Sequence, residues 1–289
     1  MKAYTIIIPC FNEENAILKT FTSIIDTTDE IDNFQIIIVN DGSYDNTKII
    51  LEQLEKKHEN VLIINHEKNK GYGAALKTGL RRANHKMIVI TDADGTYPNE
   101  RIPELVEYAI NENMDMVVGS RTAKGEVEYP LIRKIPKWFL LKYASWMAGQ
   151  KIPDMNSGLR VFKKEIAEKF ISILPNGFSF TTTITLAMLT NYYSVKYIPI
   201  SYSSRIGKSK IKPIRDTINF IQLILRTGMY FAPLRVFLPI TFILSVAFGI
   251  SFVYDTFQGN LTDKTLIFLM FTLNSGMFAL LADMIDKRN

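Results

Sequence analysis

Two aspartates separated by a single residue, Asp92 and Asp94, closely follow the apolar run Ile88-Val89-Ile90. Carboxylate oxygens are protein ligands that Mg²⁺ and Mn²⁺ prefer, and such a cation also binds the oxygens of a diphosphate. The same Asp-x-Asp-Gly pattern is common in ordinary turns, so the pair alone does not define a site. It indicates metal-assisted diphosphate chemistry only when other ligand-binding loops lie beside it.

Three more polar or glycine-rich loops follow short apolar runs earlier in the chain. They are Pro9-Cys10-Phe11-Asn12-Glu13-Glu14, Asn40-Asp41-Gly42-Ser43 and Asn69-Lys70-Gly71-Tyr72-Gly73. In open α/β sheets, ligands bind at the carboxyl ends of the strands, so we expect the four loops to converge there. The Gly71-x-Gly73 turn lacks the full dinucleotide-binding fingerprint, which argues against a nicotinamide-dependent enzyme.

These loops must be positioned by elements that alternate along the chain. The expected strands are Tyr4–Ile8, Gln35–Val39, Val61–Ile64, Met87–Thr91 and Asp115–Val118, and the expected helices are Asn15–Asp26, Asp45–Lys57, Gly73–Ala83 and Ile102–Asn111. Fully apolar strands between amphipathic helices are typical of a buried parallel sheet. The pattern predicts an α/β, Rossmann-like fold with a mostly parallel, doubly wound sheet.

Two long apolar segments, Val236–Tyr254 and Thr265–Ala282, close the chain, and neither contains a charged residue. Each is long enough as a helix to cross a hydrocarbon core of about 30 Å. A core helix of a soluble protein is usually shorter and carries a polar stripe. We therefore expect residues 1–210 to form a catalytic domain, 211–232 an amphipathic segment on the membrane surface, and 233–289 a transmembrane hairpin.

Charge predicts the orientation of this hairpin. Arg226 and Arg235 precede the first segment, and Lys287 and Arg288 follow the second. Because basic residues favour the cytoplasmic side, we expect an integral, multi-pass protein of the cell membrane with both termini and the catalytic domain cytoplasmic. The single cysteine, Cys10, excludes an intramolecular disulfide, as in cytosolic proteins. The net charge of +5 has no nucleic-acid-binding motif with it, so we expect no nucleic-acid partner.

Seven motifs, taken in order, resemble those of glycosyltransferase family 2, and within it the polyprenyl-phosphate glycosyltransferases. They are Ile8-Pro9-Cys10-Phe11-Asn12-Glu13-Glu14-Asn15, Asn40-Asp41-Gly42-Ser43, Lys70-Gly71-Tyr72-Gly73-Ala74-Ala75, Asp92-Ala93-Asp94, Val118-Gly119-Ser120-Arg121, Asp154 with Ser157-Gly158-Leu159-Arg160-Val161-Phe162, and Arg205-Ile206-Gly207-Lys208-Ser209-Lys210. The resemblance implies a GT-A type fold, Mg²⁺ or Mn²⁺ as cofactor, and inverting transfer of a hexose from a UDP-glucose or GDP-mannose class donor to a polyprenyl phosphate.

The resemblance also implies roles for individual residues. Pro9, Phe11, Glu13 and Asp41 match positions that hold the base and ribose, with Gly71 and Gly73 beside them; Asp92, Ala93 and Asp94 form the metal–diphosphate motif; and Asp154, Ser157 and Arg160 line the sugar side. The basic residues that match an acceptor-phosphate cradle are Arg121, Arg133 and Arg205, with Ser209 and Lys210 in the last motif. The residues expected to act in the transfer itself are Asp94, Arg121, Arg133 and Arg205. A surface salt bridge or a contact with a lipid headgroup is the alternative role of each arginine.

The chain departs from many mannosyl members at two places. Gly95-Thr96 stands after the metal motif instead of Leu-Gln, and the segment from Gly177 to Thr183 lacks the glutamate that often follows Gly-x-x-Phe. Both changes weaken a mannose assignment. Two other functions stay open, namely a membrane transferase acting on a hydroxyl of a glycolipid or saccharide, and a non-catalytic nucleotide-binding scaffold.

Two smaller expectations concern the rest of the chain. His58, His66 and His85 show no metal-ligand spacing, so we expect them to be surface residues. Gly249 and Gly276 leave room for the hairpin to pack against copies of itself, as small residues do in membrane helices.

Overall fold

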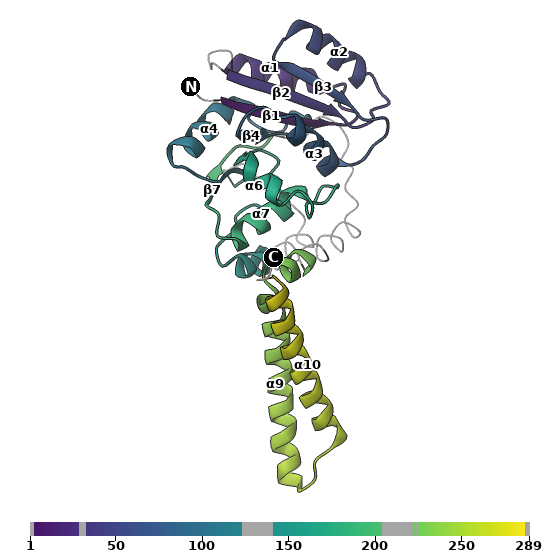
Figure 1. Ribbon diagram of the computed structural model, residues 1–289, viewed down its shortest axis with the longest axis vertical. Helices are drawn as coiled ribbons and strands as arrows, with labels where there is room; N and C mark the ends of the chain where they lie inside the picture. Colours follow the sequence, from purple (N-terminus) through teal and green to yellow (C-terminus); the bar gives the residue numbers. More distant parts are fainter. Residues whose placement is uncertain (1–2, 29–32, 123–140, 204–221, 223–224, 287–289) are drawn as a thin grey trace.

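The computed structural model describes residues 3–28, 33–122, 141–203, 222 and 225–286. An α/β domain carries two long helices, α9 (Pro233–Gln258) and α10 (Asp263–Asp286), which project from it as a hairpin (Figure 1). The far end of the hairpin is the short connection between the two helices, and α10 returns toward the α/β domain. The protein therefore has a broad domain and a narrow helical stem.

The sheet has the strand order β3-β2-β1-β4-β6-β5-β7. Its strands are β1 (Ala3–Cys10), β2 (Asn33–Asn40), β3 (Val61–Asn65), β4 (Met87–Ile90), β5 (Met116–Ser120), β6 (Arg160–Lys163) and β7 (Val195–Pro199). All neighbouring pairs are parallel except the two made by β6, which runs antiparallel to β4 and to β5. The predicted mostly parallel α/β sheet is confirmed, and β6 and β7 are additions that the sequence pattern did not predict.

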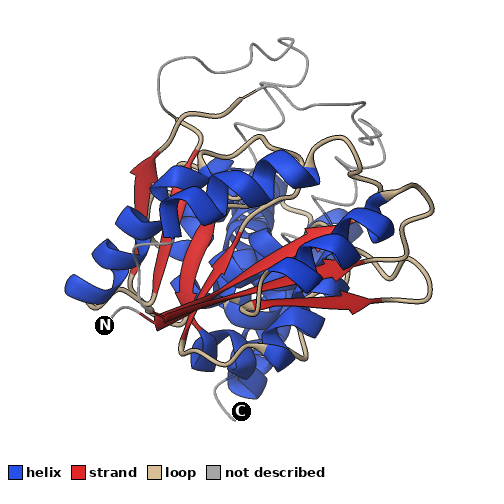
Figure 2. Ribbon diagram, turned by 90° about the horizontal axis from the view of Figure 1, so that it is seen from above, coloured by secondary structure: helices blue, strands red, loops and turns tan. Residues whose placement is uncertain are grey.

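Helices cover both faces of this twisted sheet (Figure 2). They are α1 (Ile17–Thr28), α2 (Thr47–Lys57), α3 (Tyr72–Arg82), the 3₁₀ turn η1 (Asn99–Arg101), α4 (Ile102–Asn111), α6 (Lys164–Lys169) and α7 (Phe180–Thr190). The four predicted helices correspond to α1, α2, α3 and α4. Each crosses between parallel strands, so the loops that follow β1, β2, β3 and β4 emerge at one edge of the sheet.

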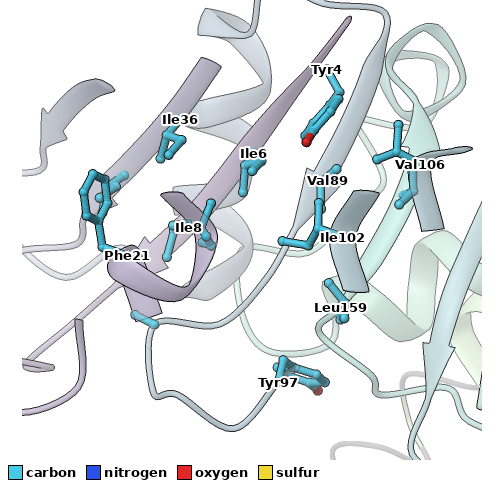
Figure 3. Close-up of a cluster of buried hydrophobic side chains, with 14 of the residues drawn as sticks. Tyr4, Ile6, Ile8, Phe21, Ile36, Val89, Tyr97, Ile102, Val106 and Leu159 are labelled. Carbon is cyan, nitrogen blue, oxygen red and sulfur yellow. The ribbon is translucent and has the colours of Figure 1, made fainter. Parts of the chain in front are cut away.

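Strand alternation divides the core into two layers. Ile6 and Ile8 of β1 pack with residues of α1 and α4, whereas Ile7 packs with residues of α3, α6 and α7. All three isoleucines are fully buried, and each contributes about 1.5–3 kcal/mol by leaving water. Figure 3 shows the first layer, with Tyr97 and Leu159 at one end of it. Tyr97 thus joins the core to the loop that follows β4.

The hairpin has the length and composition of a membrane anchor. At 1.5 Å per residue, α9 and α10 are about 39 and 36 Å long, which is enough to cross a hydrocarbon core of about 30 Å. Their most apolar stretches have mean hydropathies of 2.4 and 1.8, and only 11% and 17% of those stretches are buried. A core helix of a soluble protein would be mostly buried, so we treat the hairpin as a candidate membrane anchor. It contains both predicted apolar segments.

Polar side chains inside the hairpin pair with one another. Thr241 Oγ1 lies 2.8 Å from Ser275 Oγ, and Asp255 Oδ2 accepts hydrogen bonds from Thr262 N at 2.8 Å and Thr265 Oγ1 at 2.6 Å. These contacts fix α9 against α10 and give the hydroxyls of Thr241, Thr265 and Ser275 partners that lipid cannot supply. A Cβ on Gly276 would lie 4.0 Å from Thr241, and one on Gly249 would meet nothing within 4 Å. Packing between copies of the hairpin stays a prediction.

The start of α9 is attached to the α/β domain. Arg235 Nη1 donates to the carbonyl oxygen of Met147 at 2.5 Å, at the end of the helical residues 141–148. A cation at the last carbonyls of a helix also interacts favourably with the helix dipole. Val236 packs with Met147 and with Leu186 and Leu189 of α7. Most of the predicted amphipathic segment 211–232 lies outside the described residues, although 225–231 are helical.

Candidate active site

The loops after β1 and β2 are tied to each other by hydrogen bonds. Asn12 N donates to Ser43 Oγ at 2.9 Å, Tyr44 N donates to Asn12 Oδ1 at 3.0 Å, and Glu13 N donates to Thr47 Oγ1 at 2.9 Å. Asn12 has a φ of 53°, a left-handed conformation that asparagine tolerates better than most residues. The two predicted nucleotide-binding loops therefore form one rigid unit.

This unit contains the residues predicted to hold the base and ribose. Pro9 is buried in β1, and Phe11 is half-buried with its ring edge against Tyr44 at 5.8 Å between centroids. Glu13 is half-buried at the start of the turn that leads into α1. The fold brings Phe11 and Glu13 to the same edge of the sheet as Asp41.

Asp41 holds the glycine turn at the start of α3. Its buried carboxylate accepts hydrogen bonds from Lys70 N at 2.9 Å and Gly71 N at 2.8 Å. His66 Nδ1 lies 2.6 Å from Asp41 Oδ1, and the other ring nitrogen lies 3.0 Å from Thr78 Oγ1. The expectation that His66 is a surface residue is wrong, because it is buried between these two partners. The signal available in the sequence was its position two residues after the predicted strand Val61–Ile64.

A segment from later in the chain covers this glycine turn. A Cβ on Gly71 would lie 2.5 Å from Asn176 O, and one on Gly73 would lie 2.2 Å from Pro175 O. Gly71 also has a φ of 101°, which side-chain-bearing residues avoid. Ala74 N donates to Asn176 O at 3.0 Å. The glycines are required by the approach of residues 175–177 rather than by open space for a ligand.

Asp92 and Asp94 lie directly beyond the end of β4. Tyr72 OH donates to Asp92 Oδ1 at 3.0 Å. Asp94 is only 7% exposed, and its Oδ1 accepts hydrogen bonds from Thr96 Oγ1 at 2.6 Å and Thr96 N at 3.2 Å. Between them, the carbonyl oxygen of Ala93 accepts from Thr20 Oγ1 at 3.0 Å. The hydroxyl of Thr96, which stands where many mannosyl members have glutamine, thus orients Asp94.

Gly158 packs directly against the carboxylate of Asp92. A Cβ at this position would lie 2.7 Å from both carboxylate oxygens, so only glycine leaves the carboxylate where it is. The main-chain N of Gly158 donates to Tyr97 OH at 2.6 Å. Burial, reinforced by Asp92, raises the pKa of both Tyr72 and Tyr97 well above the ordinary value of 10. Tyr72 and Gly158 therefore contact the first aspartate, and Tyr97 holds Gly158 there. Sequence reasoning had not assigned any of the three to Asp92.

This donor set fits a divalent cation that binds together with a diphosphate. Among the described residues, no group of three or more His, Cys, Asp or Glu side chains is placed to hold a metal ion. Mg²⁺ is usually bound by one or two carboxylates, with substrate phosphates and water completing the octahedron. Asp92 and Asp94 would supply the two carboxylates, and the missing Cβ of Gly158 lets this segment pack against Asp92 without displacing its carboxylate.

Arg121 is paired with Asp154. Its Nε and Nη2 donate to the two carboxylate oxygens at 2.8 and 2.9 Å, and its main-chain N donates to Asp154 Oδ2 at 3.1 Å. The guanidinium also lies over the ring of Tyr202 at 5.2 Å. Burial acts to raise the pKa of Asp154, but the hydrogen bonds and charge of Arg121 outweigh it and hold that pKa below 3.8. In this conformation Arg121 makes the salt bridge that was the alternative to phosphate binding.

Arg160 lies inside the protein with no exposed surface. Its guanidinium donates to the carbonyl oxygens of Met155, Ser157 and Thr181 at 2.6, 2.6 and 2.9 Å, and to Thr185 Oγ1 at 2.5 Å. Burial lowers the pKa of this arginine. Arg160 was predicted to line the sugar side of the pocket. In this structure its side chain is inside the protein and holds the backbone of residues 155–157 by hydrogen bonds.

Ser157 adds a further attachment, because its hydroxyl donates to Gly119 O at 2.5 Å. The motif that contains Asp154, Ser157 and Arg160 is therefore fixed at three places, and it presents Gly158 to Asp92. The other four predicted residues of the acceptor site, Arg133, Arg205, Ser209 and Lys210, lie outside the described residues, and their roles stay predictions.

The fold is that of GT-A glycosyltransferases. A crystal structure of glucosyl-3-phosphoglycerate synthase from Mycobacterium tuberculosis in complex with Mn²⁺, UDP-glucose and phosphoglyceric acid matches with a TM-score of 0.62 at 17% identity, covering 78% of this chain and 80% of that one. A structure of Staphylococcus aureus TarS in complex with UDP-GlcNAc matches with a TM-score of 0.58 at 15% identity, covering 81% of this chain and 70% of that one. At these identities the likeness shows the fold alone.

Sequence comparison identifies the family. The model for "Glycosyl transferase family 2" matches residues 5–171, so the chain belongs to this family and is a glycosyltransferase. It is 27% identical to the dolichyl-phosphate hexose transferase of Haloferax volcanii, over 72% of this chain and 86% of that protein. It is 32% identical to the dolichol-phosphate mannosyltransferase of Pyrococcus furiosus, over 72% of this chain and 59% of that protein. The predicted family is confirmed.

Proposed function

We propose that this glycosyltransferase moves a hexose from a nucleotide-diphosphate sugar of the UDP-glucose or GDP-mannose class to a polyprenyl phosphate in the membrane, with inversion at the anomeric carbon. The observation that carries the proposal is a pair of aspartates at the carboxyl end of β4 in a domain that continues into a membrane-length hairpin. The relatives from Haloferax volcanii and Pyrococcus furiosus carry dolichyl phosphate or dolichol phosphate in their names, which supports the same acceptor class.

Asp92 and Asp94 would hold Mg²⁺ or Mn²⁺, and the structural neighbour with Mn²⁺ and UDP-glucose shares the fold. When bound, such a cation offsets the negative charge that develops on the departing diphosphate. The protein's own contribution is positioning, since Thr96 orients Asp94, Tyr72 contacts Asp92, and Gly158 leaves it room. Phe11 and Glu13, on the unit formed by the first two loops, are proposed to contact the base and ribose.

The transfer needs no general base. An oxygen of the lipid phosphate forms a bond to the anomeric carbon from the face opposite the diphosphate. The bond between that carbon and the diphosphate breaks, and its electron pair leaves with the nucleoside diphosphate. A phosphate monoester has a second pKa near 6, so the nucleophile is largely a dianion at neutral pH and gives up no proton. A sugar hydroxyl, by contrast, would require a base to remove one.

The acceptor phosphate is proposed to meet Arg133, Arg205 and Lys210, with Ser209 beside them. Guanidinium groups suit this task because their parallel N–H groups match two phosphate oxygens. Arg121 can join them only through the part of its guanidinium that does not hold Asp154. Its main role in the present conformation is to hold the segment that carries Gly158.

The membrane arrangement follows from the hairpin. Both the start of α9 and the end of α10 lie on the side of the α/β domain (Figure 1), and basic residues flank these ends in the sequence. We propose that this side is cytoplasmic, by the positive-inside rule. The domain would then work next to the bilayer surface, where the phosphate of a polyprenyl lipid lies.

The test uses the whole protein purified in detergent. It is incubated with a short polyprenyl phosphate, or with the matching free polyprenol, and with a panel of UDP- and GDP-sugars in either MgCl₂ or EDTA. The proposal expects a polyprenyl-phosphate hexose with one donor in MgCl₂ and none in EDTA. Product from the free alcohol alone would favour a hydroxyl acceptor, and undiminished transfer in EDTA would exclude the metal role.

A further inference from the structure

The reaction scheme above gives the hydroxyl of Tyr72 no role beyond its contact with Asp92. Tyr72 lies between the two glycines of the turn at the start of α3, and its hydroxyl donates to Asp92 Oδ1 at 3.0 Å. The turn itself is held on one side by Asp41, which accepts from Gly71 N at 2.8 Å, and on the other by Asn176, which accepts from Ala74 N at 3.0 Å. The backbone of Tyr72 is therefore held in place on both sides of the turn.

The ring of Tyr72 is fixed as well. It stacks on the ring of Phe178 with 5.6 Å between centroids and 22° between planes. Phe178 follows the segment 175–177 that packs on the glycine turn, and its side chain is 78% exposed. A phenylalanine at position 72 could make the same stack. The stack does not account for the hydroxyl, whose hydrogen bond to Asp92 is the contact that a phenylalanine would lose.

We propose that Tyr72 is a positioning residue that holds the carboxylate of Asp92 in the orientation needed by the diphosphate-bound cation. The hydrogen bond from its hydroxyl and the close packing of Gly158 both limit the rotation of this carboxylate. A carboxylate has about four lone-pair sites, so the hydrogen bond from Tyr72 does not by itself prevent metal binding. Partners that orient metal ligands in this way typically affect metal affinity 10- to 100-fold. The inference rests on the proposed metal role of Asp92.

Titration calorimetry tests this without requiring the transfer reaction. UDP and GDP are titrated into the full-length protein in MnCl₂ and in EDTA, for the wild type, Tyr72→Phe and the control Tyr192→Phe. Tyr192 is 90% exposed, so the substitution Tyr192→Phe removes the same hydroxyl group from a solvent-facing position. We expect Tyr72→Phe to weaken nucleotide binding by about 10-fold in MnCl₂ and to leave binding in EDTA unchanged. Tyr192→Phe is expected to match the wild type in both.

A second variant guards against a folding defect. Phe178→Leu removes the stacked ring but keeps the Tyr72 hydroxyl, and we expect a smaller loss of affinity that is again confined to MnCl₂. Thermal unfolding of each apo variant shows whether it is folded. If Tyr72→Phe is not folded, the nucleotide affinity of Phe178→Leu is used to test the proposal instead.

The outcomes distinguish the positioning role of Tyr72 from the metal role of Asp92. Wild-type affinity of a folded Tyr72→Phe in MnCl₂, or an equal loss in EDTA, overturns the positioning role alone. Binding by the wild type that does not depend on MnCl₂ overturns the metal role of Asp92, and with it this inference.

Discussion

Replacing Gly158 by alanine should impair the reaction far more than the fold. The added Cβ would lie 2.7 Å from both carboxylate oxygens of Asp92, whereas ordinary contact begins at about 3.4 Å. The carboxylate must therefore move by about 0.7 Å or rotate away. Because Gly158 does not have a positive φ, alanine is compatible with its backbone conformation. The clash involves the end of a side chain rather than main chain, so the surroundings can relax.

The magnitude follows from this displacement. Misplacing a reacting or ligating group by about 1 Å can reduce the rate by about 100-fold, so we expect kcat/KM to fall by between about 10- and 100-fold. That range corresponds to about 1.4–2.7 kcal/mol of lost transition-state stabilisation. The free energy of unfolding should fall by no more than about 1 kcal/mol, because reduced freedom of the unfolded chain offsets part of the overpacking.

The assay is hexose transfer to a short polyprenyl phosphate, measured together with thermal unfolding in detergent. Gly177→Ala is the matched control, because its Cβ would meet nothing within 4 Å and Gly177 also lacks a positive φ. We expect this control to keep the wild-type rate. Full activity in Gly158→Ala would refute the reasoning, since the position of the Asp92 carboxylate would then not matter to the reaction.

Three further substitutions test other parts of the site. Asp94→Ala should reduce turnover by at least about 100-fold without a large change in the unfolding midpoint, and retained activity would exclude it as a metal ligand. Arg160→Met leaves the buried carbonyls of Met155 and Ser157 without this donor and should destabilise the protein by at least about 2 kcal/mol in thermal unfolding; a loss below about 1 kcal/mol would contradict this. Arg121→Met should lower stability by about 2 kcal/mol at pH 7. Since the folded pKa of Asp154 lies below 3.8, this difference should be full above about pH 4 and shrink as the pH falls through that lowered pKa. A constant difference from pH 6 to pH 3 would show that the ion pair does not stabilise the fold.

Most of the sheet could be predicted because its strands are short apolar runs separated by amphipathic helices. The five strands predicted from this pattern are all present. The two missed strands have different compositions: β6 (Arg160–Lys163) begins and ends with a cation, and β7 (Val195–Pro199) is an edge strand with partly exposed side chains. Neither shows the apolar run by which a buried strand is recognised, so tertiary pairing decides their conformation.

The site was predicted unevenly for a related reason. The spacing of Asp92 and Asp94 is a local pattern and could be read directly. The contact between Tyr72 and Asp92 joins residues 20 apart, and the one between Tyr97 and Gly158 joins residues 61 apart. A single sequence contains no signal for such pairs. The charge on Arg160 was equally misleading, because an arginine with no exposed surface looks no different in sequence from one that binds a ligand.

Several motif residues that suggested ligand contacts bind other parts of the protein instead. Asp41 holds the turn at Gly71, Arg121 holds Asp154, and Arg160 holds the segment that ends at Gly158. Each of these contacts connects loops that come from distant parts of the chain and meet around the aspartate pair. A site built in this way is preorganised, because its loops are fixed before a donor arrives and little ordering remains for the transition state. Side chains that never touch the substrate would then affect the rate through the position of Asp92. For this reason, a single methyl group added at Gly158 is expected to reduce kcat/KM.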